Sequence, residues 1–262
     1  MVEAVPALKS AIVRTPGRNF ADGLTTVDLG VPDFDMALRQ YARYCDALVE
    51  CGLRVTKLDA DLRYPDSTFV EDTAILTARG AILTRPGADS RAGEVAAIAG
   101  VIRSLFPLTL QIEAPGTLDG GDICETEEHF FIGLSHRTNE EGARQLAVHL
   151  AALGYTSSTI DVRGMTSILH LKSGISYVGN NTMVVMDEMA DDPRFRSYEV
   201  IRVAREESYV ANCVRVNERL LVSAGYPRVV AALGAKGFRC LELEMSEFQK
   251  MDGGLSCLSL RF

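Results

Sequence analysis

Residues 73–84 read TAILTARGAILT, two short β-forming runs separated by Ala78, Arg79 and Gly80. The runs are predicted to pair as a hairpin, because a turn containing glycine joins two segments of strand length. The chain that follows has apolar side chains at helical spacing, namely Val95, Ile98, Ala99, Ile102, Leu105 and Phe106. This spacing predicts an amphipathic helix packed on the hairpin. The local unit is therefore two strands followed by a helix.

The same unit recurs further along the chain. Residues 122–124 and 129–134 are predicted to pair, and a helix that starts behind Asn139 should end at Gly154. Two more strand pairs are predicted, each followed by a helical stretch: residues 176–178 with 182–186, and residues 213–216 with 220–222. At the N-terminus, residues 11–14 precede a helix that starts near Asp33, and their strand partner is predicted at residues 258–260.

The spacing of these units indicates a repeat architecture. Asp72 and Asp122 begin successive units 50 residues apart, and 262 residues divided by five units gives about 52. If both ends of the chain share one unit, the repeat closes on itself. No linker or low-complexity tract interrupts it, so we expect an α/β protein with one domain over residues 1–262. The polar turns should gather at one central face, where a ligand would bind.

Composition limits the kinds of partner. The 27 basic and 35 acidic side chains give a net charge of −8, which disfavours nucleic acid and anionic membranes and favours a cationic ligand. Met1–Pro6 lack the basic start of a signal peptide, and no apolar run approaches the ~18 residues of a membrane span. We therefore expect a cytoplasmic protein.

Six cysteines occur without the spacing of a zinc site or a disulfide framework. Five of them are predicted to be structural. Cys257 differs, because it follows the glycine pair 253–254 and precedes an alternating, strand-like tail. This setting makes Cys257 a candidate nucleophile, although a buried cysteine on a terminal strand would show the same pattern.

Two acidic segments stand out. Residues 64–72 carry Asp66, Glu71 and Asp72, which tolerate proximity when a cation lies among them or when water solvates them. Residues 117–122 place Asp119 beside two glycines at the start of a strand, where the backbone can approach a ligand closely. A tight turn would explain those glycines equally well.

One histidine and two arginines complete the candidates. His170 has apolar neighbours on both sides and is either a hydrogen-bonded core residue or, together with Cys257, a proton-transfer group. Arg91 and Arg137 occupy equivalent places after the second strand of successive units. They could hold a carboxylate jointly, or each could be a surface residue at a helix start.

Six segments in this order strongly resemble the dimethylarginine dimethylaminohydrolases. They are residues 69–72, 84–91, 118–122, 137–139, 170–173 and 252–257. The resemblance spans nearly the whole chain. It implies the pentein fold of the guanidine-modifying enzymes, a five-bladed α/β propeller of ββαβ units around a central active site.

The resemblance also implies a role for each site residue. Cys257 is the nucleophile, His170 the general acid and then base, and Asp119 the carboxylate that orients His170. The implied substrate contacts are Asp72 and Asp119 at the guanidinium, Asp66 with main-chain groups near Phe20 and Met251 at the α-amino group, and Arg91 and Arg137 at the α-carboxylate. Glu71 is implied to line the same pocket. Phe20 departs from some relatives, which have leucine there.

The implied activity is hydrolysis of methylated arginines to citrulline and an alkylamine through a covalent thiouronium on cysteine. We expect no metal or organic cofactor. We expect the protein to form a homodimer. Two other enzymes of this fold are alternatives. Arginine deiminases carry an added helical domain, for which 262 residues leave no room, and agmatine deiminase acts on a substrate without a carboxylate. A non-catalytic protein of this fold, such as the ribosome anti-association factor, would have no need of the cysteine, histidine and acid set.

Overall fold

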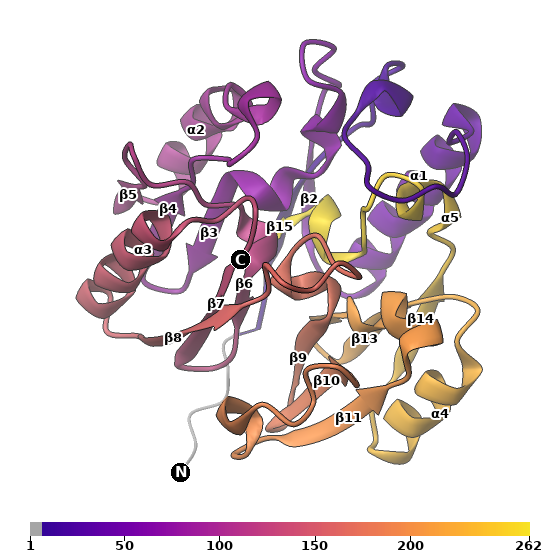
Figure 1. The fold of residues 1–262 in the computed structure, drawn as a ribbon. Helices are drawn as coiled ribbons and strands as arrows, with labels where there is room; N and C mark the ends of the chain where they lie inside the picture. The colour runs from indigo at the N-terminus through magenta and orange to yellow at the C-terminus, as the bar shows by residue number, and fades with distance from the viewer. Residues whose placement is uncertain (1–6) are drawn as a thin grey trace.

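Five small sheets form a ring in the computed structural model, which describes residues 7–262 (Figure 1). Each sheet has three strands. Their orders are β15-β1-β2, β3-β4-β5, β6-β7-β8, β11-β10-β9 and β12-β13-β14. The strands are β1 (Ser10–Arg14), β2 (Arg54–Leu58), β3 (Ala74–Thr77), β4 (Gly80–Leu83), β5 (Thr109–Gln111), β6 (Ile123–Glu125), β7 (His129–Leu134), β8 (Thr156–Asp161), β9 (Ile175–Gly179), β10 (Thr182–Met186), β11 (Glu199–Val203), β12 (Val214–Val216), β13 (Arg219–Ser223), β14 (Cys240–Leu243) and β15 (Leu260–Arg261).

Each sheet combines an antiparallel pair with one parallel strand. In the second sheet, β3 and β4 are antiparallel with Ile75 opposite Ile82, and β5 lies parallel to β4. The chain reaches β5 through the helix α2 (Glu94–Leu105), as a parallel connection requires. The unit is therefore ββαβ, as the resemblance implied. The residue pattern predicted the pair and the helix but not the third strand, because β5 is short and only partly buried.

Helices cover the outside of the ring. They are α1 (Phe34–Glu50), α2, α3 (Glu140–Ala152), α4 (Pro227–Ala235) and the short α5 (Ser246–Gln249). Figure 1 shows α1, α2, α3 and α4 at the periphery, with the sheets between them and the centre. The apolar face of α3 is buried, and its residues Leu146 and Leu150 pack against β7 residues such as Phe130. Burial of these apolar faces holds each helix on its sheet.

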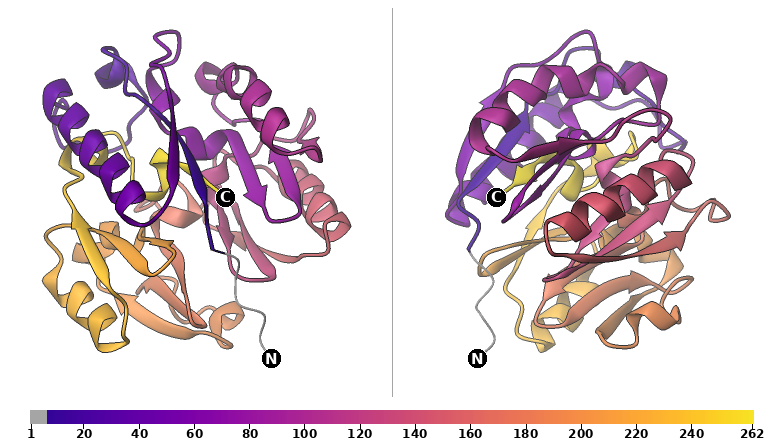
Figure 2. Two further views of the ribbon diagram at one scale, coloured as in Figure 1. Left: turned by 180° about the vertical axis from the view of Figure 1, so that it is seen from behind. Right: turned by 90° about the vertical axis from the view of Figure 1, so that its left-hand side faces the viewer.

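The two ends of the chain share one sheet, which confirms the predicted cyclic closure. Strand β15 pairs antiparallel with β1, so that Ile12 lies opposite Leu260 and Ala11 opposite Arg261. The views from behind and from the side show β15 beside β1 in the interior of the ring (Figure 2). Closure places Cys257, three residues before β15, near the centre of the molecule.

The helical stretch expected after residues 182–186 is wrong. Within the described chain, residues 187–198 contain turns and one short 3₁₀ helix, η7 (Pro193–Phe195), before β11 begins. Asp192 caps η7 and Pro193 follows it, which favours a short turn over a continuous α-helix. Phe195 is buried and anchors the turn on the core. After β13, by contrast, α4 forms as predicted.

No helix within residues 7–262 combines the length and the apolar character that crossing a bilayer requires. The expectation drawn from Met1–Pro6 lies outside the described residues.

Candidate active site

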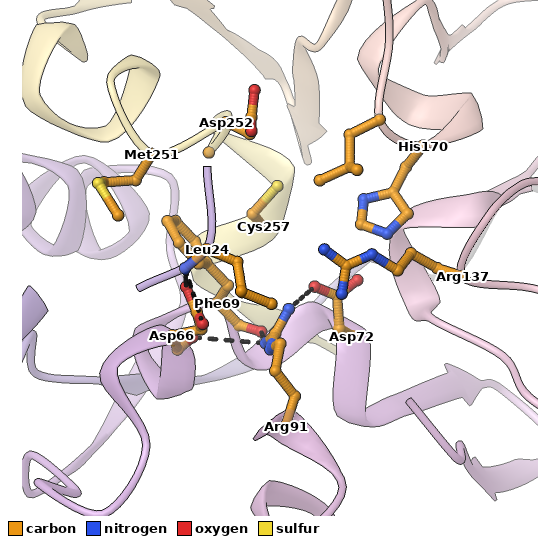
Figure 3. Close-up of a pocket in the computed structure, with 12 residues that line it drawn as sticks. Leu24, Asp66, Phe69, Asp72, Arg91, Arg137, His170, Met251, Asp252 and Cys257 are labelled. Carbon is orange, nitrogen blue, oxygen red and sulfur yellow. Dashed lines mark hydrogen bonds and ion pairs between the residues drawn. The ribbon is translucent and has the colours of Figure 1, made fainter. Parts of the chain in front are cut away.

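Turns from several blades meet at the centre of the ring and enclose a pocket (Figure 3). Its walls combine apolar side chains with charged groups of both signs. The lining residues are Leu24, Asp66, Phe69, Asp72, Arg91, Arg137, Leu169, His170, Met251, Asp252, Gly253 and Cys257. They come from segments up to about 230 residues apart, so the pocket exists only once the ring has closed.

Cys257 lies in η9 (Ser256–Leu258), the short 3₁₀ helix just before β15. The backbone N–H of Gly254 donates to its Sγ at 3.4 Å. Burial raises the pKa of the Cys257 thiol to about 12, and the nearby carboxylates of Glu71 and Asp72 add to the rise. The empty site therefore holds a protonated thiol at neutral pH, and the thiolate needs an additional positive charge.

His170 lies across the pocket from Cys257 (Figure 3). Its Nε2 is 3.0 Å from Oδ2 of Asp119, which is completely buried. Burial by itself lowers the pKa of His170, but the carboxylates of Asp122, Asp72 and Asp119 outweigh that effect and raise the pKa to about 9. His170 is therefore an imidazolium at neutral pH and can donate a proton.

Two buried acids hold the His170 segment in place. Asp119 accepts a hydrogen bond from Gly87 N–H at 2.8 Å with its other oxygen. Asp122 accepts from the backbone N–H of Leu171 at 3.0 Å, and from the hydroxyls of Ser135 and Thr138 at 2.7 and 2.6 Å. The role of Asp122 was not predicted from the sequence, where it could be read only as the first residue of a strand.

Gly121 lets the histidine approach the acids. A Cβ atom at this position would lie 2.8 Å from Nδ1 of His170 and 3.0 Å from Oδ1 of Asp72. The same residue donates its N–H to Oδ1 of Asp72 at 2.8 Å. The glycines beside Asp119 are therefore explained by close packing of the site around them.

Asp72 and Arg91 form a buried ion pair of 2.5 Å. Burial raises the pKa of Asp72, but the charges of Arg91 and His170 prevail and hold the pKa at about 2. Arg91 also donates to both carboxylate oxygens of Glu94 and to the carbonyl oxygen of Phe69. Of its five N–H groups, one on Nη1 remains for a ligand.

Arg137 is placed differently from Arg91. Figure 3 shows its guanidinium at the pocket, between His170 and Asp72. Within residues 7–262 this guanidinium makes no hydrogen bond or ion pair. Arg137 instead donates its backbone N–H to the hydroxyl of Ser135. Arg137 therefore has its donors free for an anionic group.

Asp66 lies at the end of the pocket that Leu24 lines. Its two oxygens accept from the backbone N–H of Leu24 at 3.1 and 3.2 Å. Burial raises the pKa of Asp66, although the charge of Arg91 opposes the rise. Met251 lines the same end and is almost fully buried.

The structure corrects two expectations about the lining. Phe20 is 1% exposed and packs on the rings of Phe69 and Phe248, with centroids 5.9 and 5.4 Å away, so Leu24 lines the pocket in its place. Leu24 was missed in the sequence. The preceding Gly23 was a signal, since a Cβ atom at position 23 would lie 2.4 Å from Asp66.

Glu71 is the second correction, because it is buried beside the pocket and does not line it. Its carboxylate accepts from the hydroxyl of Ser256 at 2.6 Å and forms ion pairs with Lys172 and Arg261. Both carboxylate oxygens are therefore already paired, and Glu71 acts on the pocket through its charge and through Ser256.

Asp72, Asp119 and His170 bring three potential metal-ligand atoms within 4.8 Å of one another. All three side chains already have hydrogen-bond partners within the protein. Arg91 and Gly121 occupy Asp72, and His170 and Asp119 bind each other. The donor set thus suits an organic cation with several N–H groups better than a metal ion.

Comparisons with known proteins agree with this geometry. A sequence model of the family described as "Arginine deiminase" matches residues 63–222, more than half of the chain. The N(G),N(G)-dimethylarginine dimethylaminohydrolase of Pseudomonas aeruginosa is 45% identical over 255 residues, which cover 97% of this chain and 99% of the relative.

Two solved structures are also similar. A cysteine-to-serine variant of the Pseudomonas aeruginosa enzyme, complexed with citrulline, has a TM-score of 0.95 and 44% identity and covers 98% of this chain and 100% of its own. A dimethylarginine dimethylaminohydrolase with histidine replaced by glycine, as an adduct with S-methyl-L-thiocitrulline, has a TM-score of 0.94 and 44% identity and covers 97% and 100%.

The ring of five three-stranded blades, with a cysteine, a histidine and acids around one central pocket, defines a hydrolase of the guanidine-modifying, pentein-fold class. Within that class the sequence identity is high over nearly the full length of both chains. The chain belongs to the dimethylarginine dimethylaminohydrolase family.

Proposed function

We propose that this protein hydrolyses Nω-methylated arginines, asymmetric dimethylarginine and monomethylarginine, to citrulline and dimethylamine or methylamine. The observation that carries the proposal is the pocket itself, where the Cys257 thiol faces a protonated His170 across a space bordered by buried carboxylates. The related enzyme complexed with citrulline supports the same product.

The charges along the pocket match the three charged groups of the substrate. Asp72 lies next to His170 and Cys257, where it can bind the guanidinium. Asp66 lines the pocket beside Leu24 and can receive the α-amino group. Arg137, with its free donors, is suited to bind the α-carboxylate, and Arg91 can contribute its remaining N–H. Binding would therefore select an α-amino acid with a cationic side chain.

The bound cation would generate the nucleophile. A guanidinium next to Cys257 opposes the effect of Glu71 and Asp72 and lowers the pKa of the thiol, so the thiol proton passes to solvent water and a thiolate forms. The sulfur then attacks the central guanidinium carbon. Addition forms the C–S bond and converts the planar carbon into a tetrahedral one.

His170 would then act as the general acid. It gives its proton to the alkylated nitrogen, the C–N bond breaks, and the neutral amine leaves in place of a high-energy amide anion. Because Nε2 of His170 is bonded to Asp119, the other ring nitrogen is available for this exchange. The remaining carbon is attached to Cys257 as a thiouronium.

The second half of the reaction would use His170 as a base. The neutral imidazole removes a proton from water, and the oxygen attacks the thiouronium carbon. The C–S bond then breaks, the proton of the added hydroxyl passes to the sulfur, and citrulline leaves with Cys257 restored as a thiol. Asp119 stabilises the imidazolium that forms again.

Two other guanidine hydrolases remain as alternatives. Agmatine would leave Arg137 without a carboxylate, which disfavours an agmatine deiminase. Arginine offers all three charged groups and could be a minor substrate. A non-catalytic role is disfavoured because it would leave the buried pair of His170 and Asp119 without a use.

A cytoplasmic location and a homodimer are further parts of this proposal. Cysteines 45, 51, 124, 213, 240 and 257 are all free thiols, which suits a reducing compartment. Cell fractionation tests the location, and light scattering of the purified protein tests the dimer.

The decisive experiment measures citrulline from asymmetric dimethylarginine, monomethylarginine, arginine and agmatine under steady-state conditions. We expect the two methylated arginines to have the highest kcat/KM and Cys257→Ser to abolish turnover of both. Cys240→Ser, a half-buried cysteine of β14, is the matched control and should retain activity. Preference for arginine or agmatine, or an active Cys257→Ser protein, would contradict the proposal.

A further inference from the structure

The segments that carry His170 and Cys257 meet at one side chain, that of Asn212. This residue follows η8 (Arg205–Ala211), is 6% exposed, and does not line the pocket. Lys172 is two residues beyond His170, and Ser256 immediately precedes Cys257. Asn212 contacts both.

Asn212 uses its whole amide group in these contacts. Nδ2 donates to the carbonyl oxygen of Lys172 at 2.9 Å and to Oγ of Ser256 at 3.0 Å. Oδ1 accepts from the backbone N–H of Ser256 at 2.9 Å. Two hydrogen bonds therefore go to the Cys257 segment and one to the His170 segment, which makes Asn212 a clamp between them.

The side chain of Asn212 is packed tightly against the backbone of the Cys257 segment. A Cβ atom on Gly254 would lie 2.5 Å from Oδ1 and 2.6 Å from Cγ of Asn212. The backbone of residues 254–256 thus lies directly against the amide. Gly254 also donates to the sulfur of Cys257, so the same backbone holds the thiol.

We propose that Asn212 is a positioning residue that sets the separation of Cys257 and His170, for the reaction proposed above. Attack by sulfur and proton transfer by imidazole need both groups at one substrate carbon and nitrogen together. A misplacement of about 1 Å between such groups can lower the rate about 10²-fold. The groups suited to bind substrate, Asp66 and Arg137, lie on other segments, so the effect should fall on kcat and spare KM.

Asn212→Asp tests the clamp with little change in size. It keeps an acceptor for Ser256 N–H but loses both donations by Nδ2. Asn217→Asp is the matched control. Asn217 also accepts one backbone N–H, from Leu8, and donates twice, to Leu8 O and Cys51 O, at a turn remote from the pocket. Both variants should lose similar stability in urea.

We expect Asn212→Asp to lower kcat for asymmetric dimethylarginine about 10²-fold with KM changed less than about threefold, and Asn217→Asp to leave kcat unchanged. Equal kcat values in the two variants would overturn the proposal, as would a loss confined to KM. If Asn212→Asp does not fold, Ser256→Ala removes the hydroxyl part of the clamp together with the hydrogen bond from Ser256 to Glu71, and about a tenfold loss of kcat is expected.

A crystal structure of the variant provides a readout that does not depend on the substrate. The proposal requires a changed distance between Cys257 Sγ and the imidazole of His170, and an unchanged distance overturns it. If the wild-type protein released no citrulline from methylated arginines, the proposed function would fail. Crystal structures of the wild type and of Asn212→Asp would still decide whether Asn212 sets this distance.

Discussion

Nε2 of His170 and Oδ2 of Asp119 lie 3.0 Å apart, at a carboxylate that has no contact with solvent. The two residues are 51 positions apart in the chain and belong to different blades. Their contact fixes the orientation of the imidazole and helps to keep it protonated at neutral pH. The acid–base chemistry of the site depends on this pair.

The activity should fall in alkaline solution. Burial lowers the pKa of His170, but the surrounding carboxylates raise it to about 9, so the free enzyme carries the proton below this pH and loses it above. We expect kcat/KM to decline as the pH rises through about 9, because the deprotonated imidazole cannot protonate the leaving amine. A pH profile of citrulline release checks this limb.

Asp119→Asn should shift the alkaline decline of kcat/KM to lower pH. The amide has the size of the carboxylate but no charge, so the pKa of His170 falls and the decline begins at a lower pH. We also expect a loss of kcat of about 10²-fold or more. Asp161→Asn, an exposed residue of β8, is the control and should leave the profile unchanged. An unshifted limb in Asp119→Asn would assign the titration to another group.

The resting enzyme should contain no Cys257 thiolate at neutral pH. Burial and the charges of Glu71 and Asp72 raise the pKa of the thiol to about 12. The ultraviolet absorbance of thiolate should therefore be the same for the wild type and Cys257→Ser from about pH 7 to about pH 10. Thiolate absorbance that disappears in Cys257→Ser at neutral pH would mean that the free enzyme is already activated.

Arg137→Leu should weaken binding of substrates with an α-carboxylate. A hydrogen bond to a charged group contributes about 1.5–3 kcal/mol, which corresponds to a rise in KM of about 10- to 100-fold. Agmatine has no carboxylate, so its KM should not change. Arg144→Leu, on the exposed face of α3, should have no effect on either substrate. Equal effects of Arg137→Leu on both substrates would remove the carboxylate from this position.

Gly121→Ala should disrupt the site more than the fold. The new methyl group would lie 2.8 Å from Nδ1 of His170, so the ring must shift, and we expect kcat to fall about 10²-fold. Gly100→Ala is the control, because a methyl group there meets nothing within 4 Å and its position in α2 favours alanine by about 0.5–1 kcal/mol. Citrulline release and urea unfolding measure the two effects. A fully active Gly121→Ala protein would show that the ring has room to move.

Much of the fold could be predicted because its signals are local. The hairpin of β3 and β4 and the helix α3 follow from patterns within a few residues. The pairing of β1 with the C-terminal strand followed from the repeat, which left the first unit without its second strand. The third strand of each blade has no such signal, since strands such as β5 are short and partly exposed. The expected helix after β10 is wrong because Pro193 and the buried Phe195 favour a turn.

The candidate site divides in a similar way. Cys257, His170 and Asp119 were marked by unusual local settings and by the family resemblance, and the structure brings them to one centre. Leu24, by contrast, was missed, because the pattern cannot tell which side chain of a loop faces inward. Asn212 and Asp122 carried no signal, since the groups they bind on the His170 segment, Lys172 and Leu171, lie 40 and 49 residues away.

The order and chemistry of the residues determined by themselves that this chain repeats a small unit around a ring and carries a thiol, an imidazole and acids for use on a cation. Only the tertiary structure decided which of these groups face the pocket, which are already paired, and which are protonated. The reason is physical, because burial and the charges of distant neighbours set each pKa and each hydrogen bond. Those neighbours meet only when the ring closes between β1 and β15.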